Sequence, residues 1–169
     1  NNGGLRQGKK WLYEGGIRVP LLVRVPGLTD AGTVTDVPVN GVDFFPTLVE
    51  LTGGNPVEIG SELDGESFAS VLKGADALKR KALFWHSPQL GEGGGIIAPQ
   101  GVVRMGPWKL IAYYGDTKAP ELYNLENDAS EKRNVASQYP ERVDRMRRLL
   151  EQHLDDTSAQ RVTPPVAAN

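Results

Sequence analysis

Two adjacent lysines, Lys9 and Lys10, are the side chains whose type and setting best suit chemistry in this sequence. They follow Gly8 and precede the pair Gly15-Gly16. Because glycine lets the backbone come close to a ligand, such a loop can hold an ammonium group and backbone amides against an oxyanion. The plainer interpretation is a solvated lysine pair. Large apolar side chains that would pin the loop to a core favour a functional role. They are Trp11, Tyr13 and Ile17.

His86 is the second candidate for a functional side chain. It follows the apolar run 83–85 and precedes Ser87-Pro88, so it falls at the end of an expected strand, where side chains often face a cleft. An imidazole there can act as an acid, a base or a substrate contact. A packed histidine with a satisfied hydrogen bond is the alternative, and we expect that structural role for His153.

Other kinds of site find little support. The absence of cysteine excludes disulfides, thiolate metal sites and thiol nucleophiles. No Gly-x-Ser-x-Gly elbow occurs, and the glycine-rich run 91–95 fits neither dinucleotide nor P-loop spacing. The carboxylates of the turn 124–132 do not follow the EF-hand order, so we expect a solvated turn rather than a calcium site. They are Glu126, Asp128 and Glu131.

The composition is that of a folded protein. Of 169 residues, 39% are hydrophobic and 24% charged, with a formal net charge of −2. Such a chain has no global field that would attract nucleic acid or an anionic membrane, and no apolar run approaches the roughly 20 residues that span a bilayer. We therefore expect neither partner. Because the first residue is Asn1 rather than Met, we also expect the chain to begin inside a longer protein.

The first half of the sequence predicts a loop, a strand and two helices. The short apolar run 21–25, closed by Pro26-Gly27, is typical of a buried strand. Apolar residues at helical spacing predict a helix from Asp43 to Leu51, with Pro46 in its first turn, and a shorter helix follows over 68–72.

The second half predicts a small antiparallel sheet and a long helix. Strands are expected at 82–85, 101–104, 108–114 and 121–124, with a hairpin connection at 105–107. A final amphipathic helix opens at Pro140 and should cover one face of the sheet. Its apolar stripe consists of Val143, Met146, Leu149, Leu150 and Leu154. We expect residues 91–95 to form a mobile lid or a slack loop, and residues 158–169 to form a tail.

The order of these motifs resembles the C-terminal part of the sulfatase family. LRQGKKWLYEGGIRVPLLVRVPG is similar to the family segment LRGGKGxxYEGGIRVPxIVRWPG, and similar blocks follow as far as the last helix. These blocks read PVNGVDFFPTLVELTGG, LDGESFASVLKG, ALFWHSP, VVRMGPWKLI and ELYNLENDASEKRNVA. Lys10 departs from the pattern, because the family usually has glycine there.

The resemblance implies roles for particular residues. Lys9 takes the place of the family's sulfate-binding lysine, so it is expected to be catalytic and substrate-binding, and His86 borders the substrate cleft. The family also uses calcium and a formylglycine made in a C/S-x-P-x-R motif, and neither that motif nor the early metal-binding aspartates occur here. An in-register match would make Asn2 a calcium ligand, but we interpret residues 1–4 as loop and expect no metal ligand in this chain.

The resemblance implies an α+β fold: the last strand and helix of an alkaline-phosphatase-like α/β domain, then an antiparallel sheet packed by the C-terminal helix. We expect residues 1–75 to end the catalytic domain, 76–157 to form the sheet subdomain and 158–169 the tail. The parent would hydrolyse an aryl or carbohydrate sulfate ester in the periplasm or outside the cell. This chain would need the missing N-terminal catalytic domain for activity, and alone it could self-associate. Two alternatives stay open: a phosphodiesterase or phosphonate hydrolase of the same superfamily, and a non-catalytic domain that binds sulfated glycans.

Overall fold

The computed structural model describes residues 2–59, 63–88, 98–114 and 118–160. The chain divides into two compact units. One comprises the residues up to Val19 together with those from Ala82 onward, and the other comprises Pro20–Lys81. This division differs from the boundary expected near residue 75, because the lysine loop packs with the C-terminal sheet. The assignment of residues 1–75 to a catalytic domain stays a prediction.

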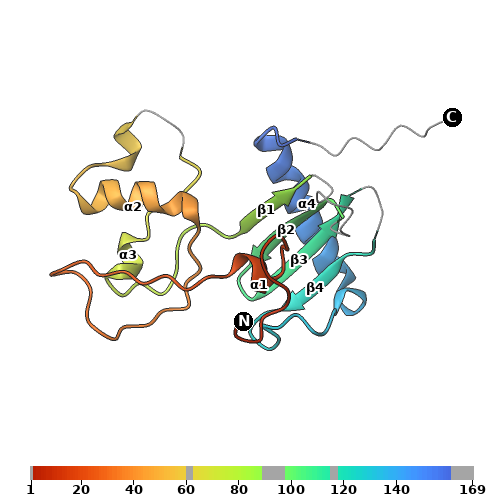
Figure 1. The fold of residues 1–169 in the computed structure, drawn as a ribbon. Coiled ribbons are helices and arrows are strands. Elements are labelled where there is room, and N and C mark those ends of the chain that lie inside the picture. The colour runs from red at the N-terminus through yellow and green to blue at the C-terminus, as the bar shows by residue number, and fades with distance from the viewer. Residues whose placement is uncertain (1, 60–62, 89–97, 115–117, 161–169) are drawn as a thin grey trace. The chain divides into compact units, whose positions relative to one another are not determined.

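The first unit is built on a four-stranded antiparallel sheet in the order β1-β2-β3-β4 (Figure 1). The strands are β1 (Leu83–Ser87), β2 (Gln100–Met105), β3 (Trp108–Tyr113) and β4 (Glu121–Asn124). The tight connection between β2 and β3 contains Gly106 at a φ of 54°, a left-handed conformation that suits glycine. All four predicted strands and this hairpin are confirmed, and no strand end shifts by more than two residues.

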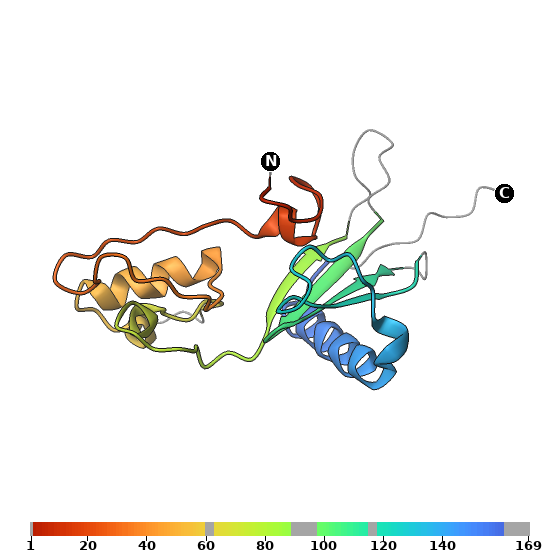
Figure 2. The ribbon, with the colours of Figure 1, turned by 90° about the horizontal axis from the view of Figure 1, so that it is seen from below.

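Side chains alternate across the sheet and give it two covered faces. One face packs on the 17-residue helix α4 (Pro140–Asp156) through Val103, Leu110, Ala112 and Leu122. Pro140 opens α4 as predicted, and its buried residues are Val143, Met146, Leu150 and Leu154. The opposite face packs on the N-terminal segment that contains α1 (Glu14–Ile17), so this segment and α4 lie on opposite sides of the sheet (Figure 2).

The second unit contains short helices joined by irregular chain. They are the 3-10 turns η1 (Gly41–Asp43) and η2 (Pro56–Ile59) and the helices α2 (Phe44–Leu51) and α3 (Ala69–Leu72). Asp43 is fully buried, where it receives the amides of Asn40 and Glu66 and pairs with Arg80 at 2.5 Å. Burial opposes ionisation, but these partners outweigh it and lower the pKa of Asp43.

The predicted strand at 21–25 is not formed. These residues have irregular backbone, and Leu22 is 88% exposed. A strand needs a neighbouring strand to satisfy its amides, and the four strands of the described chain pair only with one another. Within the described residues, no helix has the length and apolar character needed to cross a membrane.

Candidate functional site

Lys9 lies in a tight turn at the tip of the N-terminal loop. The amide of Trp11 donates to the carbonyl oxygen of Gly8 at 3.0 Å and closes this turn around Lys9 and Lys10. Both lysines are exposed. Lys10 has a φ of 82°, a conformation that glycine adopts far more easily than lysine. The backbone therefore explains why a glycine would suit position 10.

The pair Gly15-Gly16 lets the loop fold back on itself. The Gly15 amide donates to the carbonyl oxygen of Arg6 at 3.0 Å. A β-carbon at Gly15 would clash with the carbonyl oxygens of Arg6 and Gln7, and one at Gly16 would clash with those of Trp11 and Gly8. Any larger residue at position 15 or 16 would force the segment that carries Lys9 to move.

Apolar contacts fasten the loop to the sheet. Tyr13 is buried against the face opposite α4, and Trp11 and Leu12 pack beside it. The residues of the sheet and its margin that receive them include Val102, Ile111, Tyr113, Tyr123 and Leu125. Lys9 is thus an exposed side chain on a loop whose neighbouring residues belong to a core, as the aromatic content of the loop predicted.

A buried ionic cluster reinforces this attachment. Lys109 of β3 is completely buried, and its Nζ lies 2.9 Å from Glu14 Oε1 and 2.8 Å from Glu131 Oε1. The backbone amide of Glu14 donates to Glu131 Oε2 at 2.7 Å. Burial raises the pKa of Glu131, and Lys109 offsets only part of this effect. Removing Lys109 would leave the buried carboxylates of Glu14 and Glu131 without their cation, and such a loss typically costs about 3–5 kcal/mol.

A second polar cluster surrounds Glu121 at the edge of the same face. Glu121 receives the hydroxyls of Tyr13 and Tyr113 at 2.9 Å and that of Tyr123 at 2.5 Å, and it pairs with Lys118. Burial alone would raise the pKa of Glu121, but these donors outweigh it and lower the pKa to about 2. Glu121 therefore stays ionised and ties Tyr13 of the loop to the sheet.

Arg6 joins the two clusters. Its Nη1 donates to Tyr123 Oη at 2.7 Å and to the backbone oxygen of Glu131 at 2.9 Å, and lies 3.4 Å from Glu121 Oε2. Its guanidinium carbon also lies 3.8 Å from the centroid of the Tyr13 ring. Arg6 and Glu14 thereby fix both ends of the loop that carries Lys9, a rigid setting in which an ammonium can receive an oxyanion.

His86 lies on the other face of the sheet from Lys9. Its neighbour Phe84 packs on the α4 side, where it stacks on His153 with ring centroids 3.9 Å apart, whereas Trp85 faces the loop side. His86 Nε2 donates to the carbonyl oxygen of Gln160 at 2.7 Å, and its Nδ1 is hydrogen-bonded to Tyr114 Oη at 2.7 Å. The structure does not bring His86 to Lys9, and its role as a substrate contact stays a prediction.

The acidic turn corrects one expectation. Glu126 is exposed, but Glu131 is completely buried and faces Lys109, so the turn is not simply solvated. Asp128 accepts the amides of Lys132 and Arg133 and shapes the turn. Across the described ranges, no three histidine or acidic side chains come together as metal ligands. Asn2 is exposed, and its side-chain amide donates to the carbonyl of Gln7.

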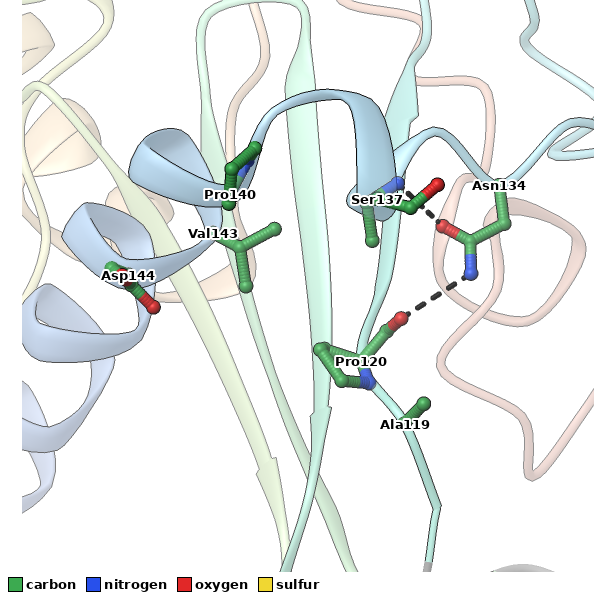
Figure 3. A pocket seen from close by; sticks show the side chains of 8 residues that line it. Ala119, Pro120, Asn134, Ser137, Pro140, Val143 and Asp144 are labelled. Atoms are coloured by element: carbon green, nitrogen blue, oxygen red, sulfur yellow. Dashed lines mark hydrogen bonds between the residues drawn. The ribbon is translucent and has the colours of Figure 1, made fainter.

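A shallow hollow of about 360 Å³ lies where the chain enters β4 and α4 (Figure 3). Pro120 and Val143 line it, and Asn134 bridges its rim by donating to the Pro120 carbonyl and accepting the Ala136 amide. None of its lining residues belongs to the lysine loop. The glycine-rich run 91–95, a candidate lid, lies outside the described residues.

Sequence reasoning missed the residues that position the loop. Lys109 carried a usable signal, because it falls in the middle of the strand WKLIAY, where a charge must either reach solvent or find acidic partners. Its partners Glu14 and Glu131 lie 95 and 22 positions away, 109 minus 14 and 131 minus 109, and no local pattern links them.

Comparison with known proteins supports the resemblance to the C-terminal part of sulfatases. Residues 6–160 match the family model described as N-sulphoglucosamine sulphohydrolase, C-terminal. The chain is 38% identical to a sulfatase of Formosa agariphila, with 83% of this chain and 26% of that protein covered. It is 34% identical to arylsulfatase K of Mus musculus, with 79% and 24% covered. The chain thus spans about a quarter of the length of these relatives.

Solved structures share the fold. The crystal structure of Ps i-CgsB in complex with k-i-k-neocarrahexaose matches with a TM-score of 0.78 and 26% identity, covering 98% of this chain and 35% of that one. The structure of BT4656 in complex with its substrate D-glucosamine-2-N,6-O-disulfate matches with a TM-score of 0.52 and 25% identity, covering 67% and 23%. From its sequence, its fold and these relatives, the chain belongs to the N-sulphoglucosamine sulphohydrolase C-terminal family, the C-terminal part of sulfatases.

Proposed function

We propose that the protein containing this chain hydrolyses sulfate esters, and that this chain supplies a sulfate-binding lysine, Lys9, and part of the wall of the substrate cleft. The observation that carries the proposal is the setting of Lys9: an exposed ammonium on a loop fixed at both ends by Arg6 and Glu14. A fixed cation close to the non-bridging sulfate oxygens would stabilise the charge that develops in the transition state.

The nucleophile and the metal would come from another part of the parent. Family resemblance implies formylglycine and calcium, but the C/S-x-P-x-R motif does not occur in this sequence, and within the described residues no three histidine or acidic side chains cluster as metal ligands. Calcium would hold the sulfate and the nucleophile, and Lys9 would add a charge that needs no metal. The chain by itself should therefore not turn over substrate.

A carbohydrate sulfate is the substrate class that the relatives favour. The complexes with neocarrahexaose and glucosamine disulfate involve sugars, and the second of these ligands is itself a sulfate ester. The test is to read the frame upstream of Asn1 for C/S-x-P-x-R and to assay the full-length protein for sulfate release from sulfated disaccharides and from a chromogenic aryl sulfate. Release that disappears when the motif's cysteine or serine is replaced supports the proposal. An upstream frame without the motif, or no release from either class, would overturn it.

A further inference from the structure

We infer that Glu131 is a positioning residue for Lys9, and that Lys109 fixes its carboxylate for this purpose. The inference rests on the proposed function of Lys9 in sulfate binding. Glu131 belongs to the acidic turn, does not face solvent and would not touch substrate. Its effect would pass through the backbone of the lysine loop.

Glu131 holds both ends of that loop with two different groups. Its carboxylate accepts the backbone amide of Glu14 at 2.7 Å, and its own backbone oxygen accepts from Arg6 Nη1 at 2.9 Å. Arg6 and the residue after Glu14 are the pair that the hydrogen bond at the base of the loop joins. One residue of the acidic turn therefore sets where the base of the loop lies on the sheet.

The backbone at Glu131 is costly for a glutamate. Its φ is 52°, a conformation that glycine or asparagine adopts more readily. This cost motivates the hypothesis that the Glu131 side chain is needed there, and the hydrogen bond that its carboxylate accepts from the Glu14 amide shows what the side chain does. The carboxylate is also completely buried, so its charge loses hydration and regains it only through Lys109 and the Glu14 amide.

A contribution to stability does not by itself explain why Lys109, Glu14 and Glu131 are buried together. Buried ion groups are often no more stabilising than apolar side chains of similar volume, because desolvation offsets the attraction between the charges. What the cluster supplies is one defined position, since Lys109 Nζ meets Glu14 and Glu131 at 2.9 and 2.8 Å. A cation that must match the oxygens of a transition state needs such placement, because a shift of about 1 Å can cost roughly a hundredfold in rate.

A double-mutant cycle in the full-length protein tests the inference. The variants are Lys9→Ala, Glu131→Gly and the two combined, assayed by kcat/KM for sulfate release, with folding checked by thermal melting. Glycine suits the φ of residue 131, so the turn should survive while the carboxylate is lost. Glu131→Gln keeps an oxygen for the Glu14 amide but loses the ion pair with Lys109, so it is the partial variant. Glu126→Gln at an exposed position of the same turn is the control.

We expect Glu131→Gly to lower kcat/KM about tenfold or more, Glu131→Gln to lose less than Glu131→Gly, and Glu126→Gln to stay within about threefold of wild type. Once Lys9 is absent, adding Glu131→Gly should change kcat/KM by less than about threefold, because both changes remove the same interaction. Losses that multiply, or a folded Glu131→Gly enzyme with wild-type kcat/KM, would overturn the inference. A Lys9→Ala enzyme with wild-type turnover would instead overturn the proposed function, and this inference with it.

If Glu131→Gly does not fold, Arg6→Lys carries the same test. The Arg6 side chain is 34% exposed, so the change is milder, and it removes the hydrogen bond to the Glu131 backbone oxygen while keeping the charge. We expect a loss of about threefold or more that does not add to that of Lys9→Ala. Multiplying losses would again overturn the inference.

Discussion

The backbone amide of Gly15 donates to the carbonyl oxygen of Arg6 at 3.0 Å. This hydrogen bond closes the lysine loop at its base, and it depends on glycine because a side chain at Gly15 would meet the Arg6 carbonyl. Lys9 therefore projects from a closed loop, and a change at the base of that loop should shift the position of Lys9.

In the full-length protein, Lys9→Ala should lower sulfate-ester turnover on the order of a hundredfold, as loss of an oxyanion stabiliser does. Its melting temperature should stay the same, because the side chain is exposed. Lys10→Ala, in the same turn and also exposed, is the matched control and should do much less. Steady-state rates measure both, and equal losses would show that the sulfate-binding lysine had been misassigned.

Lys10→Gly should stabilise the chain. The φ of 82° at Lys10 carries a penalty that glycine does not have, so the free energy of unfolding should rise by roughly 0.5–1 kcal/mol. Lys9→Gly is the control, because Lys9 has no positive φ. Glycine there should only raise the conformational entropy of the unfolded chain, and so lower the free energy of unfolding. Urea unfolding followed by tryptophan fluorescence compares the two. The backbone argument fails if both variants lose stability to the same extent.

Glu121 and Glu131 should give stability opposite dependences on pH. The pKa of Glu121 falls from 4.5 to about 2, so its contribution is complete above pH 4.5 and is lost as the pH drops toward 2. The pKa of Glu131 is raised above 4.5, so its contribution is complete below pH 4.5 and is lost as the pH rises through the raised value.

Urea unfolding from pH 3 to 7 checks these signs with Glu121→Gln and Glu131→Gln. The free-energy gap between wild type and Glu121→Gln should widen as the pH rises from 3. The gap for Glu131→Gln should narrow as the pH rises above 4.5. Gaps that move in the same direction would contradict the assigned environments.

Gly16→Ala should destabilise the loop, because a β-carbon there meets the carbonyl oxygens of Trp11 and Gly8. Overpacking of this kind costs about 1–3 kcal/mol. Gly41→Ala is the matched control, since a β-carbon at Gly41 meets nothing within 4 Å. Thermal melting of the two variants should show a clear fall only for Gly16→Ala. A comparable fall at Gly41 would remove the steric explanation.

The isolated chain should self-associate through the unit Pro20–Lys81. Large apolar side chains of this unit are exposed, among them Leu22 at 88%, Phe45 at 52% and Leu48 at 59%, and burying one such side chain contributes about 1.5–3 kcal/mol. Sedimentation should show association that weakens in a Phe45→Ser, Leu48→Ser double variant. A wild-type chain that stays monomeric at high concentration would contradict this expectation.

The sheet and its helix could be predicted because their signals are local. Alternating apolar residues and the turn at Gly106 define the strands, and Pro140 with its apolar stripe defines α4. The strand at 21–25 could not be settled in the same way. An apolar run shows that a segment prefers burial, but it does not show which neighbour will bury it.

The candidate site was predictable only in part. Lys9 stands out by family resemblance and by its glycine-rich setting, but the residues that hold it do not. The pairing of Glu14 with Lys109 joins residues 95 positions apart, and that of Arg6 with the Glu131 backbone joins residues 125 positions apart. Such contacts depend on the whole fold and leave no local signal. The sequence therefore predicted a solvated turn at 124–132, although Glu131 is buried.

The two faces of the β1–β4 sheet are covered by segments that leave the ribosome at very different times. The lysine loop comes first, and Glu131 follows Arg6 by 125 residues. At roughly 5–20 residues per second, the loop waits about 6–25 s before its anchor exists. Contacts this distant along the chain also form late in folding. Lys9 would therefore be held in place only after residue 131 has been made, long after its own loop has left the ribosome.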